Sequence, residues 1–415
     1  MAVLNVAAVR EQFPALSRQH DGRPAVFFDG PAGSQVPRTV IDAIGDYLRQ
    51  HNANHGGVFA TSVENDELLL HAQRAAADFL GTSDPQSIVF GANMTTVTFA
   101  FSRALAQTWQ PGDEIIVTDL DHDANVTPWV LAARDRGVTV KHVAVRPEDC
   151  TLDLEDLDSK LNSHTRLIAV GAASNAVGTI NPIMDIVKER VRKAPRAEIF
   201  LDAVHYAPHG WISQAAQGCD YVVCSAYKFF GPHIGILWGR RDRLEELTPY
   251  KVRPSSDDCP DRWMTGTPNF ECIAGVRAAI QYIADLGIGN NRQAQLRSAF
   301  ARIGVYEREL GLQLLHGLTE LPCVRVLGIT DPARFDGRFP ERVPTFSIVH
   351  QRYPAKAVAE HLAQRGIFVW HGNFYALRLS EMLGTEPAGM VRIGLLHYNT
   401  ADEVARLLAA LRELP

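Results

Sequence analysis

The sequence predicts an α/β protein, with a mostly parallel sheet in a large domain and a smaller C-terminal α+β domain. Short apolar, β-branched segments alternate with helix-like segments through the first three hundred residues. This alternation is typical of a parallel sheet covered by helices on both faces. Near residue 295 it gives way to one long helical segment and a mixture of shorter elements. The sequence therefore predicts an N-terminal arm over 1–25 that packs on the small domain, a large domain over 26–294 and a small domain over 295–415.

The elements follow in chain order. The first is an amphipathic helix, because Val6, Val9, Phe13 and Leu16 fall on one side of it. In the large domain, the sequence predicts a strand followed by a turn over 87–93 and a turn into a buried strand over 111–122. Further strands are predicted at 138–145, 165–178, 197–205, 220–228 and 234–242, with helices at 95–109, 127–137 and 182–194. The small domain is predicted to have a long helix at 293–318, strands at 343–350 and 390–396, and helices at 354–366 and 400–414.

Composition excludes several classes of protein. The chain has 415 residues, a formal charge of -6 and 46% hydrophobic residues, with no basic block of the kind that binds nucleic acid. No apolar run reaches the length of a membrane span, and the N-terminus is charged too soon for a signal peptide. The six cysteines are dispersed without a CxxC pair, which predicts free thiols in a cytoplasmic protein. No spacing typical of a zinc or other metal site is present.

One lysine lies in an unexpected place. Lys228 stands in the middle of "YVVCSAYKFFGPHIGILWG", which is otherwise apolar, aromatic or small. Burial disfavours the charged form of a lysine, so its pKa falls. A neutral lysine is a good nucleophile for carbonyls, which makes Lys228 a candidate for a Schiff base.

Other polar residues follow the predicted strands, at the edge where open α/β sheets bind ligands. The turn that contains Asn93, Met94 and Thr95 opens a helix, and a helix N-terminus can bind phosphate. Asp202 ends a strand, where a carboxylate could pair with a protonated ring nitrogen. His122 could stack on a flat cofactor. Each feature alone has an ordinary explanation as a helix cap, a turn residue or a core histidine, but with Lys228 they describe one cofactor, pyridoxal 5′-phosphate (PLP).

Eight motifs in order then resemble the class V aminotransferase group of PLP enzymes, most closely the cysteine desulfurases and their relatives. The resemblance covers nearly the whole chain and implies fold type I, with a seven-stranded sheet and a homodimer. The motifs are "FFDGPAGSQVP", "NANHGGVFATSVEN", "DLDHDANVTPW", "ASNAVGTINP", "LDAVHYAPH", "SAYKFFGP", "TGTPN" and "VRIGLLHYNT".

The resemblance implies a role for each matching residue. Lys228 would form the Schiff base, Asp202 would hold the pyridine nitrogen and His122 would stack on the ring. Around the cofactor it places Asn175, His205 (where the family usually has a glutamine), and Ser225 and Tyr227 as phosphate ligands, the family's histidine being Tyr227 here. Thr267 would reach the phosphate of a partner subunit, Arg392 would bind the substrate α-carboxylate, and His55 lies in a segment where the family's arginine is replaced by Gly56.

The sequence departs from the desulfurase pattern at one position. Desulfurases carry a mobile cysteine in the loop before the carboxylate-binding arginine, and the corresponding stretch here is "FVWHGNFYALRL", with Tyr375 at the place of the cysteine. Tyr375 could donate a proton or could be an aromatic lid that closes the site against water.

Several reactions remain open on these residues. We expect deprotonation at Cα by Lys228 followed by β-elimination with C–S bond cleavage, which needs no cysteine nucleophile. An epimerase using Tyr375 or His55 as proton donor and an aminotransferase are alternatives. So is a desulfurase that uses an external thiol. A non-catalytic binding protein with this fold would have little reason to keep a buried lysine.

Overall fold

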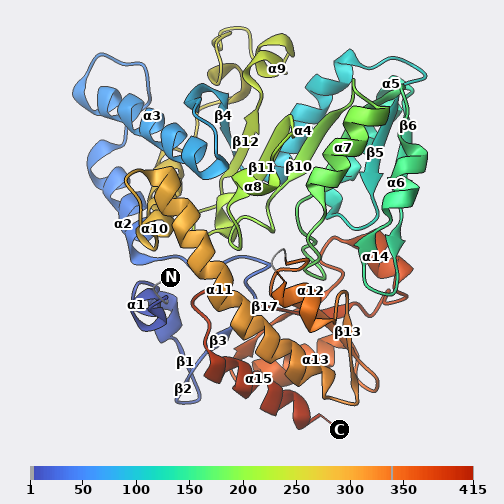
Figure 1. Ribbon diagram of the computed structural model, residues 1–415. Helices are drawn as coiled ribbons and strands as arrows, with labels where there is room; N and C mark the ends of the chain where they lie inside the picture. Colours follow the sequence, from blue (N-terminus) through green and yellow to red (C-terminus); the bar gives the residue numbers. More distant parts are fainter. Residues whose placement is uncertain (1–3, 338–339, 415) are drawn as a thin grey trace.

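The computed structural model describes residues 4–337 and 340–414. Its larger sheet has seven strands in the order β4-β12-β11-β10-β9-β5-β6 (Figure 1). The strands are β4 (Ile88–Gly91), β5 (Glu114–Thr118), β6 (Thr139–Val143), β9 (Thr165–Gly171), β10 (Glu198–Asp202), β11 (Tyr221–Ser225) and β12 (Gly235–Gly239). Only β12 is antiparallel to its neighbours, β11 and β4. The predicted α/β class with a mostly parallel sheet is confirmed.

The antiparallel strand follows from the segment that carries Lys228. Between β11 and β12 there is only a short 3-10 helix, η6 (Ala226–Lys228). A parallel connection needs a crossover of a dozen residues or more, so the chain turns back here instead. The predicted strand over 220–228 therefore ends at Ser225, and Lys228 stays at the carboxyl edge of the sheet.

Helices cover both faces of the large sheet. The connections after β4 and β5 contain α4 (Met94–Leu105) and α5 (Thr127–Arg136), whereas the returning connections contain α6 (Leu154–Lys160), α7 (Ile183–Lys193) and α8 (Ile212–Ala215). Right-handed crossovers place these two groups on opposite faces, and Figure 1 shows α7 and α8 in front of the sheet and α4 behind it. The helices α2 (Arg38–Asp46) and α3 (Ala60–Leu80) precede the first strand of this sheet in the chain. The helices α9 (Arg241–Glu246) and α10 (Phe270–Asp285) follow its last strand.

A second, antiparallel sheet lies below the first in Figure 1. Its order is β13-β14-β17-β16, formed by β13 (Val324–Leu327), β14 (Thr345–His350), β17 (Met390–Gly394) and β16 (Trp370–Gly372). The helices of this part are α11 (Arg292–Thr319), α12 (Pro332–Asp336), α13 (Ala355–Ala363), α14 (Leu377–Met382) and α15 (Ala401–Arg412). The predicted helix at 293–318 is thus present with nearly the same bounds.

Short strand pairs complete the chain: β1 (Gln19–His20) with β2 (Arg23–Pro24), β3 (Val26–Phe27) with β15 (Ile367–Phe368), and β7 (Val145–Arg146) with β8 (Thr151–Leu152). Because β3 pairs with β15, Val26 and Phe28 join the hydrophobic cluster of the smaller sheet. The division of the chain at 25/26 and 294/295 stays a prediction.

The N-terminal helix is shorter than predicted. α1 (Val6–Glu11) ends before Pro14, which starts a separate 3-10 turn, because proline cannot continue an α-helix. Val9, Phe13 and Leu16 are nevertheless buried. The ring of Phe13 lies 5.0 Å from that of Tyr398 and 5.9 Å from that of Phe230. Among the helices that the structure describes, none is long and apolar enough to cross a membrane.

Candidate active site

A cavity of about 100 Å³ lies where the carboxyl ends of β4, β5, β9, β10 and β11 meet. The parallel strands bring together residues that are far apart in the chain, as expected for this class of sheet. Ten of the predicted site residues line the cavity: Asn93, Met94, Thr95, His122, Asn175, Asp202, His205, Ser225, Tyr227 and Lys228.

Lys228 reaches this cavity from η6. Its Nζ donates hydrogen bonds to the backbone carbonyls of Pro31 and Ala32, the second at 3.2 Å. Burial, and then the positive charge of Arg392, lower the pKa of Lys228 to about 7, against the opposing charge of Asp202. The amine is therefore largely neutral above pH 7 and available as a nucleophile or base.

Two carboxylates lie at the floor of the cavity. Asp202 accepts a hydrogen bond from the backbone N–H of Val204 at 2.8 Å, and burial raises its pKa to about 6. Asp121, which the sequence reasoning did not assign to the site, accepts from the N–H of Gly171 at 2.9 Å. Burial and the neighbouring charge of Asp202 raise the pKa of Asp121 to about 7. The sequence feature that could have pointed to Asp121 is its position directly after the strand "EIIVTDL", next to His122.

His122 is held as a neutral ring. Its Nδ1 accepts the backbone N–H of Ala124 at 3.0 Å, so Nε2 carries the proton. Burial and the charges of Lys228 and Arg392 lower the pKa of His122 to about 4. Its ring stacks on that of Tyr375, with centroids 5.3 Å apart and planes 27° apart. A neutral imidazole with one face against the cavity is suited to stack on an aromatic ligand.

The N-terminus of α4 faces the cavity. Asn93 caps the helix by accepting the N–H of Thr96 at 2.9 Å, and the N–H of Met94 donates to Ser225 Oγ at 2.9 Å. The helix dipole and the unpaired N–H groups of a first turn favour an anion here. The Tyr227 ring stacks on His233, with centroids 4.8 Å apart, and lies 5.0 Å from Lys228 Nζ.

His205 links the cavity to the smaller sheet. Its Nε2 lies 3.1 Å from Thr345 Oγ1 on β14. Burial, and then the charge of His209, hold the pKa of His205 well below its usual value. The ring is therefore neutral and can exchange a hydrogen bond with a ligand oxygen, as an amide would.

Arg392 lies on β17 beside the cavity and is almost fully buried. One terminal guanidinium nitrogen donates to the backbone carbonyl of Asn175 at 2.8 Å. Burial lowers the pKa of Arg392 to about 9, opposed by the nearby carboxyl of Asp29. Arg392 Nε and Asn175 Oδ1 are both buried, with no hydrogen-bond partner among the described residues. Because an unpaired buried donor is costly, Nε is poised for an anionic ligand.

The comparisons with known proteins agree with this arrangement. Residues 26–407 match the family described as aminotransferase class-V. The chain belongs to the class V aminotransferase family. A cysteine desulfurase of Yersinia pseudotuberculosis is 32% identical over 430 residues, which cover 99% of this chain and 98% of the relative.

Solved structures show the same fold. An apo cysteine desulfurase from Thermococcus onnurineus NA1 has a TM-score of 0.87 at 24% identity, over 100% of this chain and 98% of the other. A C-DES mutant with glycine covalently linked to its PLP cofactor has a TM-score of 0.78 at 20% identity, over 97% and 98% of the two chains. Membership of the family makes this chain a fold type I, PLP-dependent enzyme.

The residues of this class V enzyme fit PLP. A helix N-terminus suited to a phosphate, a buried carboxylate of raised pKa, a neutral histidine ring and a neutral lysine amine converge on one cavity. Asn175 Oδ1 is an orphaned acceptor in the wall of the same cavity. Lys228, Asp202, His122 and the α4 N-terminus would hold the cofactor, which supplies an electron sink when bound.

Two predicted residues are not brought to this cavity by their own chain. His55 and Thr267 line a separate hollow of about 350 Å³. His55 lies 3.9 Å from Asp66, and its side chain is 44% exposed. Both the place of His55 next to the substrate and the reach of Thr267 into a partner subunit stay predictions.

Tyr375, which the resemblance places at the position of the family's loop cysteine, lies in an unusual backbone conformation. Tyr375 is 71% exposed and, like Phe374, has a left-handed backbone, with φ values of 59° and 58°. Its carbonyl accepts the N–H of Asp123 at 2.8 Å, and its N–H donates to Asn373 Oδ1 at 3.1 Å. Bulky residues seldom adopt this conformation, which concentrates at functional sites.

Two residues near Arg392 escaped the sequence assignment of the site. The Phe374 ring lies 4.2 Å from the guanidinium carbon of Arg392. Asp29 is partly buried, its Oδ1 atom is buried and unpaired among the described residues, and the loss of solvent raises its pKa to about 6. The only signal for Asp29 was its place in "FFDGPAGSQVP".

Proposed function

We propose that this enzyme catalyses β-elimination from an amino acid with a sulfur-bearing side chain, cleaving the C–S bond. The proposal is supported by the lowered pKa of Lys228, together with the aromatic Tyr375 beside His122, at the position where the resemblance places the cysteine of a desulfurase. Lys228 would serve for Cα deprotonation, and a tyrosine at this position offers no thiol to accept sulfur.

The cysteines of the chain support this proposal. None is among the described residues that line the cavity. Cys150, Cys219, Cys224 and Cys259 are buried, and burial raises the pKa of the Cys150 thiol to about 11 and that of Cys219 to about 12. Because the thiolate is the reactive form, these thiols are poor sulfur acceptors.

Each residue then has a defined task. Arg392 binds the substrate carboxylate through its unpaired Nε, with Phe374 and the Asn175 carbonyl fixing the guanidinium. Lys228 takes the Cα proton, and Asp202 holds a proton on the ring nitrogen. With L-cysteine, elimination of hydrogen sulfide leaves aminoacrylate, and hydrolysis of its imine form consumes one water, so that L-cysteine and one water give pyruvate, ammonia and hydrogen sulfide.

Product analysis tests the proposal. The PLP-loaded enzyme is incubated with L-cysteine and with L-cystine, and Lys228→Ala serves as the inactive control. Pyruvate and ammonia in equal amounts are expected. Alanine with releasable sulfane sulfur, and no pyruvate, would overturn the proposal.

A second candidate is desulfuration with an external thiol as the sulfur acceptor. It is favoured by the names of the relatives, which are cysteine desulfurases at 30% identity or more over nearly the full chain. It predicts that alanine formation rises with added thiol. Tyr375→Cys separates the two candidates further, since it restores a thiol at the family's position.

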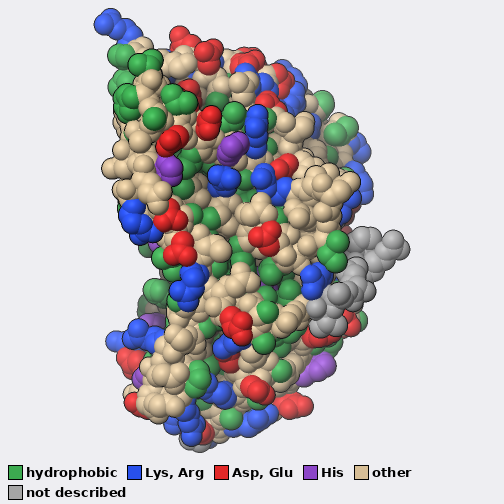
Figure 2. All heavy atoms as spheres, turned by 90° about the vertical axis from the view of Figure 1, so that its left-hand side faces the viewer, with side chains coloured by type: hydrophobic (Ala, Val, Ile, Leu, Met, Phe, Trp, Pro, Cys, Tyr) green, Lys and Arg blue, Asp and Glu red, His purple; other side chains and the backbone are tan. Residues whose placement is uncertain are grey.

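We also propose that the enzyme is a cytoplasmic homodimer in which Thr267 reaches the partner's cofactor. Large apolar side chains are exposed near the hollow that contains Thr267, among them Val58 (101%), Phe59 (58%) and Val252 (67%). Figure 2 shows hydrophobic side chains on the side of the molecule that carries α2 and α3. Exposed apolar patches of this kind are typical of protein interfaces. Light scattering should give twice the chain mass, and Thr267→Ala should weaken PLP binding without changing that mass.

A further inference from the structure

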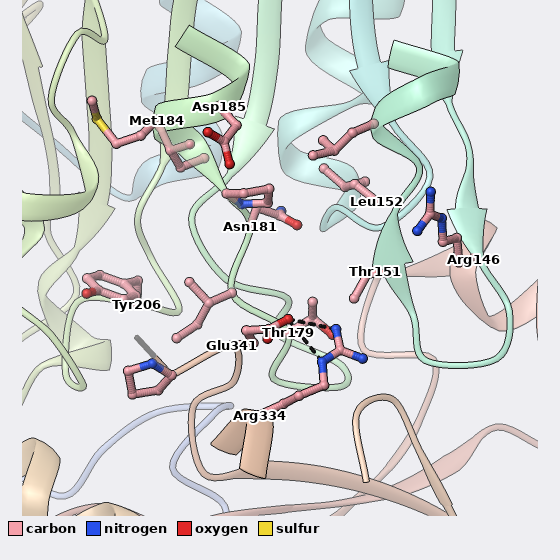
Figure 3. Close-up of a pocket in the computed structure, with 15 residues that line it drawn as sticks. Arg146, Thr151, Leu152, Thr179, Asn181, Met184, Asp185, Tyr206, Arg334 and Glu341 are labelled. Atoms are coloured by element: carbon pink, nitrogen blue, oxygen red, sulfur yellow. Dashed lines mark hydrogen bonds and ion pairs between the residues drawn. The ribbon is translucent and has the colours of Figure 1, made fainter. Parts of the chain in front are cut away.

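A second and larger cavity lies away from the candidate active site. Its volume is about 570 Å³, which is within the range of small-molecule sites. Its walls come from the β7–β8 hairpin, the segment that leads into α7, and the chain around α12 (Figure 3). The cavity therefore lies between connecting segments of the large sheet and the region of α12. No step of the proposed reaction uses it.

Two buried polar atoms in the wall of this cavity lack hydrogen-bond partners among the described residues. They are Asn181 Oδ1 and Thr179 Oγ1. Asn181 is 4% exposed and Thr179 is 1% exposed. Asn181 Nδ2 donates to the carbonyl of Gly171 at 2.8 Å, which fixes the amide and leaves Oδ1 as the unpaired acceptor. Buried polar atoms are nearly always paired, so these two favour a ligand that carries an N–H or O–H donor.

The rest of the wall is apolar on one side and charged on the other. Leu152 and Ile183 are buried, and Met184 and Tyr206 extend the apolar surface. Figure 3 shows Asn181 above the open space, Tyr206 to its left and Arg146 to its right. An apolar ligand body fits between these walls.

The two arginines of the cavity differ in availability. Arg334 is bonded at 2.7 Å both to Asp149 and to Glu341, so its charge is neutralised. Arg146 has a single acidic neighbour, Asp153, at 3.6 Å, and its side chain is 44% exposed. Arg146 can therefore turn to a carboxylate at the rim of the cavity.

We propose that this cavity binds a free α-amino acid with an apolar side chain, as a site separate from the catalytic one. The ammonium group donates to Asn181 Oδ1 and Thr179 Oγ1, the side chain packs on Leu152 and Ile183, and the carboxylate pairs with Arg146. This class of ligand carries the donor, the apolar body and the anion that the three parts of the wall require.

The cavity is joined to the active site through the backbone. The N–H of Asn181 donates to the Ala172 carbonyl at 3.0 Å, and the N–H of Ala172 donates to the Asp202 carbonyl at 2.7 Å. Gly171, which accepts from Asn181, also lines the catalytic cavity. An amino acid bound at Asn181 therefore stabilises the segment that carries the floor of the active site.

The test uses L-phenylalanine as the probe and the PLP-loaded full chain. Saturation-transfer NMR and the melting temperature report binding, and a crystal soaked with the probe locates it. At ten times Kd, a rise in melting temperature of about 1–2 °C is expected. 3-Phenylpropanoate, which lacks the amine, should bind about tenfold more weakly.

Matched variants assign the signal to this cavity. In an Arg392→Ala background, which removes the proposed catalytic carboxylate contact, Met184→Trp fills the cavity from α7 and should abolish the NMR signal, whereas Val191→Trp, two turns along the same helix, should not. Thr179→Val should weaken binding several-fold. Arg392→Ala should leave the signal intact, which separates this site from the catalytic carboxylate site and from the proposed reaction. A signal that persists in the Met184→Trp, Arg392→Ala double variant, a signal lost in Arg392→Ala alone, or only ordered water at this cavity in the soaked crystal would each overturn the proposal.

Discussion

The Phe374 ring covers one face of the Arg392 guanidinium, with 4.2 Å between the guanidinium carbon and the ring centroid. The backbone carbonyl of Phe374 also accepts Asn175 Nδ2 at 2.8 Å, and the carbonyl of Asn175 accepts from Arg392. The three residues thus form a closed set of contacts. Phe374 acts on the predicted carboxylate-binding residue without itself contacting a carboxylate.

We expect Phe374→Ala to raise KM about tenfold for amino-acid substrates, because a buried cation–π contact contributes about 1–2 kcal/mol. kcat should change much less, since the deprotonating amine is elsewhere. Steady-state kinetics measures both values. Leu377→Ala, which removes an exposed apolar side chain at the start of α14, is the control and should leave KM unchanged. An equal fall in kcat with constant KM would contradict this assignment.

The rate at which the cofactor-free enzyme captures PLP should rise with pH through about 7. Only the neutral Lys228 amine is nucleophilic, and its pKa is lowered to about 7 by burial and then by the charge of Arg392. Below this pH the rate should fall about tenfold per pH unit. Stopped-flow absorbance measures the rate.

Two charge variants should shift the midpoint of this pH profile in opposite directions. Arg392→Gln removes a cation that lowers the pKa of Lys228, so the midpoint should move up. Asp202→Asn removes an anion that raises the same pKa, so the midpoint should move down. Midpoints that move together, or a wild-type midpoint near the ordinary pKa of lysine, would show that the amine does not lie in the environment described.

Tyr375→Phe should lower turnover clearly more than cofactor occupancy. The Tyr375 ring stacks on His122, and the phenolic hydroxyl is the only group that the substitution removes. Turnover and the bound-cofactor absorbance are measured on the same preparation. Unchanged turnover would reduce Tyr375 to a packing role, as an aromatic lid.

Glu307→Ala should strongly destabilise the enzyme. Glu307 Oε2 on α11 lies 2.7 Å from His209 Nδ1, and both side chains are buried. Removal of one partner of a buried pair costs about 3–5 kcal/mol. The midpoint of urea unfolding should therefore fall far more than in Glu309→Ala, an exposed neighbour on the same helix. Glu307→Gln keeps a hydrogen-bond acceptor and should lie between the two.

The sequence predicted those site residues that lie at the carboxyl ends of strands. Asn93, His122, Asp202 and Lys228 follow β4, β5, β10 and β11, and parallel strands bring such residues to one edge. Their meeting therefore needed only the alternation of strands and helices, together with the resemblance to a known family.

The contacts that the sequence did not predict depend on the crossing of distant elements. Phe374 meets Arg392 because the loop after β16 folds over β17, and no periodicity records that crossing. Asp29 reaches the site because its segment pairs with Gly394. The N-terminal helix was predicted too long for a local reason. The apolar spacing continues past Pro14, but a proline cannot continue the helix.

The hydrogen bond from the N–H of Asp123 to the carbonyl of Tyr375 involves only main-chain atoms. The distance between residue 375 and the stacking histidine is therefore set independently of which side chain occupies position 375. A substitution at position 375 therefore changes the side chain beside His122 without removing the hydrogen bond that holds the loop. The chemistry offered at this position is thus separable from the fold, because one codon determines the side chain and the main chain determines where it stands.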